Sequence, residues 1–308
     1  MLSGPNYVTS FNTSIFAIAG YYTDYDGDQH VIAAARDGDV SQVIWDPSEL
    51  APGYHPRVDR LWHFDNMVTI AGFFTPDDNY HHAVATTSDG KLHELWFKRG
   101  EAPPHKTDLP YDMSGFHPKK GMASFYSPCD DLRHVVIVDR NGHPVDITWK
   151  ANSPTSGIPL TIAPAGSQIA SISGFLSKDE NPNTRHIVVA QNDTGQIYDI
   201  AYPSENNVGQ NYVLTSFNEP VQNVTAFFSS DTNYRHIVVL TSTNFLKDLA
   251  YSPYHVSGVY TGSIQLISPA LANVADITSF YSAHDQLCHV LYVTGDGNLY
   301  EITYTSHG

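Results

Sequence analysis

The stretch FYSAHDQLCHVLYVTGDGNLYEITY, residues 280–304, carries the pattern that decides the fold. Two aromatic residues end an apolar segment, a short acidic turn follows, and His289 begins a β-branched run. Asp296-Gly297 then leads into an alternating segment that ends at Tyr304. Alternation with a period of two is typical of strands, and Asp-Gly is a preferred tight hairpin turn. The stretch therefore predicts three successive antiparallel strands.

The same pattern recurs along the whole chain of 308 residues. Each copy is marked by a histidine in the same register: His30, His82, His134, His186, His236 and His289. A weaker fourth strand follows several copies, for example at 60–64, 159–162, 212–217 and 263–267. Four antiparallel strands repeated six times are typical of a β-propeller. We therefore predict an all-β, six-bladed propeller that occupies residues 1–308 as a single domain.

Closure of the ring is predicted from the two ends of the chain. The sixth copy has no fourth strand after Tyr304, whereas the N-terminal segment NYVTSFN (6–12) nearly repeats NYVLTSFN (211–218), an outer strand of the fourth copy. We expect residues 6–12 to complete the last blade and to cover its open edge. Small residues such as Gly20 and Gly72 precede the aromatic pairs, as crowded first strands require.

Composition excludes several classes of partner. Lys and Arg number 16 against 32 Asp and Glu, a net charge of −16, which opposes nucleic acid and anionic membranes. No apolar window is long enough for a membrane span, and no signal peptide is visible. We expect a cytoplasmic protein, or one exported without a recognisable signal; the oligomeric state stays open. Cys129 and Cys288 are predicted to lie in equivalent loops of opposite blades, as free thiols.

The repeated histidine is predicted to be a packing residue whose ring nitrogens bond a neighbouring loop. Six copies spread around a ring cannot converge on one metal or one substrate. In the expected hairpin register, each histidine faces the aromatic residue that ends the third strand. We also expect the histidine to lie on the same face of the sheet as the aliphatic residue thirteen positions later in the sequence.

Candidate ligand-binding residues come from three repeated positions. The residue before the histidine is arginine in three blades, the third strand of those blades carries aspartate, and that strand ends in an aromatic residue. Arginine and carboxylate groups grip hydroxyls, and aromatic faces pack on sugar C–H surfaces. Within one blade, the arginine position and the aspartate position are expected to lie roughly 13 Å apart along the strands. The candidates are Arg133, Arg185, Arg235, Asp146, Asp199, Asp248, Trp45 and Trp149.

Metal and catalytic motifs are sparse. The turn at Asp24, Asp26 and Asp28 resembles the start of a calcium loop, although turns favour aspartate in any case. The histidines outside the repeat form no zinc-binding or hydrolase motif, and they are expected in solvated loops. We expect no cofactor, and calcium at this turn is the candidate metal.

The repeat, with its Phe-Tyr-Ser-x-x-Asp-x-x-x-His start in the sixth blade, resembles the six-bladed fucose-binding lectins of fungi and related bacterial sugar-binding propellers. The resemblance covers the whole chain at the level of architecture. It implies sugar binding between adjacent blades by Arg, by Glu or Gln, and by Trp or Tyr. Only blades 3 to 5 carry the arginine here.

Three functions remain open from the sequence. The first is a multivalent glycan-binding protein, with a glycan or other small polar ligand at each of several junctions. The second is a single-site enzyme of lyase, hydrolase or cyclase type at the channel mouth. The third is a protein-interaction scaffold. The enzyme hypothesis predicts that polar side chains converge at the channel mouth. The candidates are Asp139, Arg140, His143, Lys178, Asp179, His284 and Asp285.

Overall fold

The computed structural model describes residues 2–46, 56–99, 101, 104–116, 121–150, 160–161, 169–177, 184–203, 210–252 and 262–306. They form six four-stranded antiparallel sheets, the blades that the repeat predicts, and the fold class is the six-bladed β-propeller. The chain divides into two compact units: Met1–Ser114 with Ala272–Thr305, and Gly115–Leu271 with Ser306–Gly308. Within the described ranges, no helix has the length and hydropathy needed to cross a membrane.

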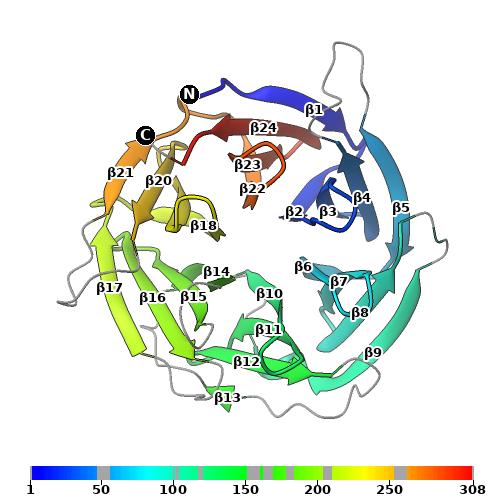
Figure 1. Cartoon of the computed structure of the whole chain (residues 1–308). Helices are drawn as coiled ribbons and strands as arrows, with labels where there is room; N and C mark the ends of the chain where they lie inside the picture. The colour runs from blue at the N-terminus through cyan, green and yellow to red at the C-terminus, as the bar shows by residue number, and fades with distance from the viewer. Residues whose placement is uncertain are drawn as a thin grey trace. The chain divides into compact units, whose positions relative to one another are not determined.

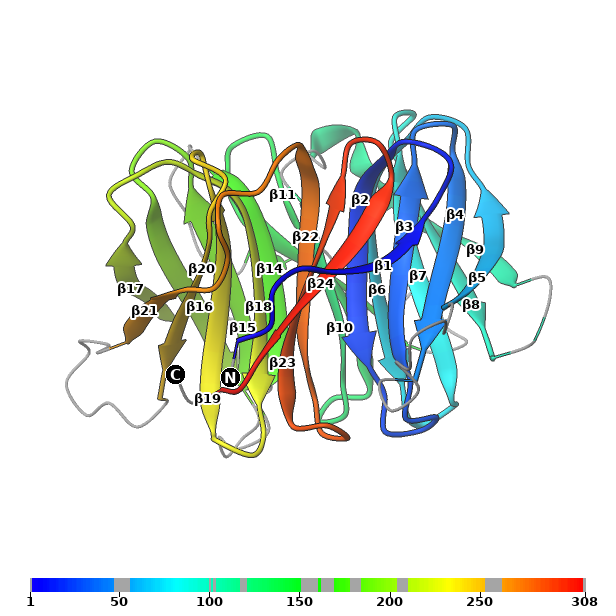
Figure 2. The same ribbon diagram turned by 90° about the horizontal axis from the view of Figure 1, so that it is seen from above.

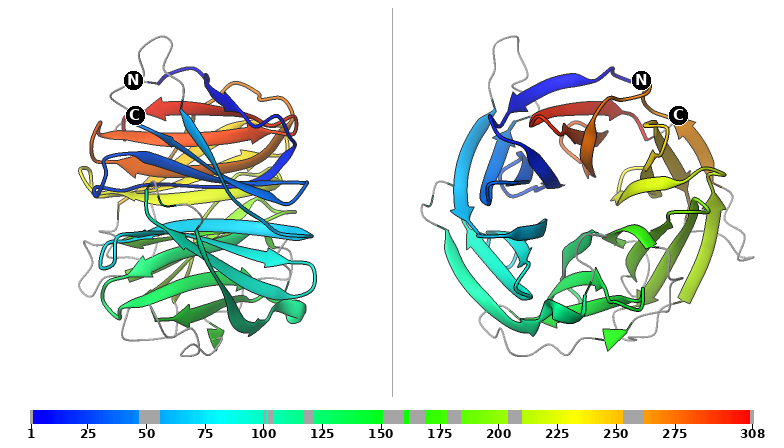
Figure 3. Two further views of the ribbon diagram at one scale, coloured as in Figure 1. Left: turned by 90° about the vertical axis from the view of Figure 1, so that its right-hand side faces the viewer. Right: turned by 180° about the vertical axis from the view of Figure 1, so that it is seen from behind.

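The first unit contains blades 1, 2 and 6, and the order of strands in each can be followed in Figure 1 and Figure 3. Blade 1 consists of β2 (Ile15–Tyr22), β3 (Gln29–Ala35), β4 (Asp39–Trp45) and β5 (Arg57–His63). Blade 2 consists of β6 (Met67–Thr75), β7 (Tyr80–Thr87), β8 (Lys91–Phe97) and β9 (His105–Asp112), followed by a short 3-10 helix, Met113–Gly115. Blade 6 consists of β22 (Val274–Ser282), β23 (Leu287–Thr294), β24 (Asn298–Tyr304) and β1 (Asn6–Ser10).

The second unit contains blades 3, 4 and 5. Blade 3 consists of β10 (Met122–Ser127), β11 (Leu132–Val138), β12 (Pro144–Trp149) and β13 (Leu160–Thr161). Blade 4 consists of β14 (Ile169–Ser177), β15 (Thr184–Gln191), β16 (Gln196–Pro203) and β17 (Gln210–Ser216). Blade 5 consists of β18 (Val221–Ser229), β19 (Tyr234–Thr241), β20 (Leu246–Tyr251) and β21 (Ser263–Leu266). The weak fourth strands expected from the sequence are thus confirmed.

The N-terminal strand completes blade 6, as predicted. Strand β1 pairs antiparallel with β24, with Asn6 opposite Glu301 and Ser10 opposite Asn298. Figure 2 shows the blue β1 beside the red β24. The chain also passes from β1 towards β2 against the turn between β23 and β24, where the Phe11 amide donates to the Gly297 carbonyl at 3.0 Å. The edge of β24 is therefore covered by hydrogen bonds from a segment distant in sequence.

The small residues of the first strands let neighbouring blades approach closely. A Cβ atom at Gly20 would meet the side chains of Thr278 and Phe280, which belong to blade 6. The Gly20 amide donates to Thr278 Oγ1 at 2.7 Å, and the Ile18 amide donates to Asp276 Oδ2 at 2.7 Å. Side chains of β22 thus satisfy amides at the open edge of β2, which would otherwise be buried without partners.

The core consists of β-branched and aromatic residues packed between adjacent blades. In the first unit, Val31 and Trp45 of blade 1 pack in one cluster with Phe280 and Leu291 of blade 6. One cysteine differs from expectation: Cys288 lies buried in β23 instead of in a loop, because the turn before it ends earlier than the pattern suggested. Both Cys129 and Cys288 are free thiols, as expected.

We predict that Gly297→Ala destabilises the protein far more than Gly27→Ala. Both glycines have positive φ, 87° and 72°, where alanine costs about 1–2 kcal/mol. A Cβ atom at Gly297 would also collide with the backbone carbonyl of Thr13, whereas nothing lies within 4 Å of one at Gly27. Urea unfolding should therefore show a loss of about 3 kcal/mol or more for Gly297→Ala. Equal losses in the two variants would contradict this account of blade 6.

Candidate binding sites at the blade junctions

The repeated histidine stacks on the first-strand aromatic residue of its own blade. Ring centroids lie 4.8 to 5.3 Å apart in all six blades. The pairs are Tyr21–His30, Phe73–His82, Phe125–His134, Phe175–His186, Phe227–His236 and Phe280–His289. The expectation that it faces the aromatic residue of the third strand was wrong by one residue. That position pairs with the residue before the histidine, as in Arg133 opposite Trp149.

The third-strand acid is the buried partner of the same histidine. In blade 3, His134 Nδ1 lies 2.8 Å from Asp146 Oδ2. Equivalent contacts of 2.8 to 2.9 Å join the histidine to Glu94, Asp199, Asp248 and Glu301 in blades 2, 4, 5 and 6. Blade 1 carries the neutral Gln42, 2.9 Å from His30 Nδ1. The aspartate or glutamate at this position therefore has a structural role, because it binds the buried histidine of its own blade.

An acid in the turn before the histidine contacts the other ring nitrogen. His30 Nε2 lies 3.1 Å from Asp26, His289 Nε2 lies 3.1 Å from Asp285, and His134 Nε2 lies 3.6 Å from Asp130. We had not predicted this contact from the sequence. The signal was present as Asp-x-x-x-His, which occurs at Asp26, Asp78, Asp130 and Asp285.

The junction of blades 3 and 4 assembles an arginine, a tyrosine and two carboxylates. Arg185 lies 3.2 Å from Asp130 of blade 3, and its guanidinium lies over the Tyr202 ring at 4.9 Å. The Tyr202 hydroxyl donates to Asp146 at 3.0 Å. The expected distance of roughly 13 Å separates the arginine position from the aspartate position of the same blade. Across the junction, arginine and tyrosine reach acids of the preceding blade.

The junction of blades 4 and 5 repeats the arginine, the tyrosine and the third-strand acid. Arg235 lies 3.9 Å from Asp199, and the Tyr251 hydroxyl donates to the same carboxylate at 3.1 Å. The Arg235 guanidinium lies 5.7 Å from the centre of the Tyr251 ring. Because the same residue types meet at both junctions, the arrangement is a property of the repeat in blades 3 to 5.

All eight sequence-predicted site residues are buried. Arg185 and Arg235 are 2% exposed, and Trp45 and Trp149 are 1% exposed and pack in the core. Arg133, Asp146, Asp199 and Asp248 are buried as well. The Asp130 side chain, at 20% exposed, is the part of the blade 3–4 network that reaches solvent.

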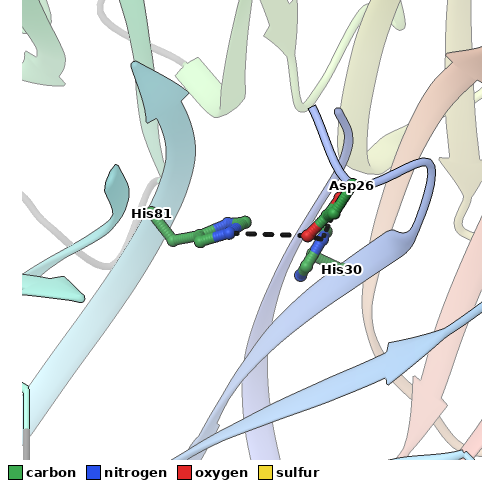
Figure 4. A group of neighbouring side chains, drawn as sticks. All are labelled: Asp26, His30 and His81. Atoms are coloured by element: carbon green, nitrogen blue, oxygen red, sulfur yellow. Dashed lines mark hydrogen bonds and ion pairs between the residues drawn. The ribbon is translucent and has the colours of Figure 1, made fainter. Parts of the chain in front are cut away.

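The junction of blades 1 and 2 has a different composition. His81 stands where blades 3 to 5 carry arginine, and one oxygen of Asp26 lies 3.1 Å from His30 Nε2 and 3.7 Å from His81 Nε2 (Figure 4). Asp28 pairs instead with Arg99, and Asp24 is exposed. The three carboxylates of the calcium candidate therefore have different surroundings.

The polar residues of the enzyme hypothesis have local roles where they are described. Asp139 accepts hydrogen bonds from the Asn141 and His143 amides at 2.8 Å, which stabilises its own turn. Arg140 and His284 are exposed, and Asp285 contacts His289. Outside the described residues lie Lys178, Asp179, His55, His117, His255 and His307.

We predict that stability falls with rising pH because of His289. Burial alone would lower its pKa, but hydrogen bonds to Asp285 and Glu301 raise the pKa of His289 to about 9. A raised pKa adds stability that is complete below about pH 6.5 and is lost as pH rises through about 9, about 3 kcal/mol in all. Unfolding free energies measured from pH 6 to 10 should show this fall.

The variant His289→Asn should remove that part of the pH dependence. Phe280→Leu is the control, because it removes the stacked ring but leaves the titrating group. It should lower stability at every pH and keep the slope. A slope that survives in His289→Asn would contradict the assignment.

Comparison with solved structures finds propeller lectins of similar architecture. The SapL1 lectin in complex with alpha methyl fucoside aligns with a TM-score of 0.67 and 12% identity over 96% of this chain and 94% of that chain. AofleA from Arthrobotrys oligospora aligns with a TM-score of 0.66 and 13% identity over 98% and 87%. The lectin of Aleuria aurantia, described as six-bladed with a novel mode of fucose recognition, aligns with a TM-score of 0.59 and 12% identity over 84% and 80%.

No protein-family model and no curated protein matches the sequence. At 11 to 16% identity, the structural likeness shows the fold of this chain. That fold is the six-bladed β-propeller of these lectins.

Proposed function

We propose that this protein is a multivalent glycan-binding propeller whose sites lie at blade junctions. The observation that carries the proposal is the blade 3–4 junction, where Arg185 and Tyr202 of blade 4 meet two carboxylates of blade 3. Guanidinium and carboxylate groups together offer donors and acceptors to sugar hydroxyls. The structural neighbours SapL1 and the Aleuria aurantia lectin bind fucosides by their descriptions, which supports this class of ligand.

The partly exposed Asp130 is where a sugar would enter this network. Its carboxylate is held by Arg185 and lies beside His134, so its position is set before a ligand arrives. A preorganised polar group loses less entropy on binding. In this proposal Asp130 and Arg185 contact the sugar.

We propose that two of the other predicted residues contact the ligand and that five hold the site in place. Arg133 and Arg235 are proposed for the equivalent contacts of their own blades. Asp146, Asp199 and Asp248 hold the repeated histidines, and Trp45 and Trp149 pack behind the strands. We propose that these five support the site from the core.

The test compares two triple variants with the same change in charge. Arg133→Ala/Arg185→Ala/Arg235→Ala removes the junction arginines, and Arg36→Ala/Arg57→Ala/Arg140→Ala removes three exposed arginines elsewhere. An AofleA variant with three arginines replaced by alanine has the same fold, with a TM-score of 0.68 to this chain. Circular dichroism and thermal unfolding establish that both variants are folded.

Binding is first surveyed on a glycan array and then measured by calorimetry, with methyl α-L-fucoside as the first probe. We expect the junction variant to lose at least about tenfold in affinity, because a hydrogen bond to a charged group contributes roughly 1.5–3 kcal/mol. The control should bind as the wild type does. A folded wild type that binds no glycan on the array would refute the proposal, and equal binding by both variants would refute the arginine assignment.

A further inference from the structure

Three metal-ligating side chains meet at the junction of blades 1 and 2. Asp26 and His30 come from blade 1, and His81 comes from β7 of blade 2 (Figure 4). One ligand atom from each lies within 4.8 Å of the other two. His30 Nε2 is 3.1 Å from Asp26 Oδ2, and His81 Nε2 is 3.7 Å from the same oxygen.

The far nitrogen of each imidazole ring already has a partner that orients the ring. Gln42 lies 2.9 Å from His30 Nδ1, and the Tyr21 hydroxyl lies 3.2 Å from His81 Nδ1. Both rings therefore present Nε2 to Asp26. Metal-binding histidines are oriented through the nitrogen that does not bind the metal, which donates its proton. Because the Gln42 contact is made by its amide nitrogen, metal binding through His30 Nε2 requires the Gln42 amide to turn and present its oxygen.

His81 Nε2 is a buried ligand atom that lacks a hydrogen-bond partner among the described residues. The whole residue is 1% exposed.

The equivalent junction of blades 3 and 4 carries an arginine where the junction of blades 1 and 2 carries His81. There the turn carboxylate Asp130 lies beside the permanent positive charge of Arg185. At the junction of blades 1 and 2 the arginine position holds His81, and the third-strand acid of blade 1 is replaced by Gln42. A carboxylate beside two imidazole nitrogens is a ligand set for a cation.

We propose that Asp26, His30 and His81 bind one divalent transition-metal ion of the zinc class at this junction. Two imidazoles and one carboxylate favour Zn²⁺, Co²⁺ or Ni²⁺ over the oxygen-preferring Ca²⁺ and Mg²⁺. Bonds of about 2.0 Å in a tetrahedron place ligand atoms about 3.3 Å apart, close to the two measured separations. Three protein ligands leave a fourth position for water or another small ligand.

The site lies just below the surface, beside two aromatic rings. The Asp26 side chain is 7% exposed, so its carboxylate lies just below the surface. Exposed Tyr25 stacks on Phe74 at 5.6 Å, and Phe74 contacts the His81 ring at 5.1 Å. These two aromatic rings flank the site and limit the access of bulk water.

The experiment uses the full chain without a histidine tag, after treatment with a chelator. Zn²⁺ binding is measured by calorimetry, and Co²⁺ binding by its visible absorption, which reports nitrogen ligands and coordination geometry. The variant His81→Arg restores the arginine that blades 3 to 5 carry, so it should fold while losing a ligand. Asp26→Asn removes the anionic ligand with little change in shape. His63→Ala is the control, because His63 is exposed and lies between Asp39 and Asp65 on the surface.

We expect one saturable site per chain in the wild type and in His63→Ala, with a higher melting temperature when Zn²⁺ is present. His81→Arg and Asp26→Asn should each lose at least about 100-fold in affinity. Absence of a saturable site in the wild type would overturn the proposal. Unchanged affinity in either folded ligand variant, or loss of the site in His63→Ala, would also overturn it. None of these outcomes depends on glycan binding at the blade 3–4 junction.

Discussion

The buried contact between the repeated histidine and the third-strand acid is the interaction on which blades 2 to 6 depend, and in blade 1 Gln42 takes the place of the acid. An ionisable pair taken out of water is tolerated only when both members are held in good geometry. In blade 3, His134 stacks on Phe125 of the first strand and contacts Asp146 of the third. One side chain thus determines the register of three strands. A slip by one residue would turn it to the other face and leave the acid buried and unpaired.

Alternation along the strand separates this structural role from the chemistry of the junction. The residue before the histidine points to the opposite face, towards the preceding blade. It is Gln29 in blade 1, His81 in blade 2 and Arg185 in blade 4, and each meets a polar group of that neighbour. The junctions can therefore differ in chemistry while the blades stay alike. This is why we propose both a sugar site and a metal site in one repeating scaffold.

The number of blades, the outer strands and the closure by β1 could be predicted because they depend on repeat spacing and on near-identical segments. The partner of the histidine could not, since a strand pattern does not determine register to one residue; the Arg133–Trp149 pair took the place expected for His134. Contacts such as Arg235 with Asp199 join two blades, and spacing within one blade says nothing about them. The turn acids were readable as Asp-x-x-x-His, but turn propensity alone explained aspartate there.

The pairing of β1 with β24 also orders events during synthesis. Asn6 is synthesised before its partner Glu301, which follows 295 residues later in the chain. At 5–20 residues per second, the first strand waits about 15–60 s for its neighbour. Blades 3, 4 and 5 lie wholly between these two strands in the sequence. They can therefore fold while β1 is still unpaired, so the pairing of β1 with β24 follows the synthesis of three whole blades.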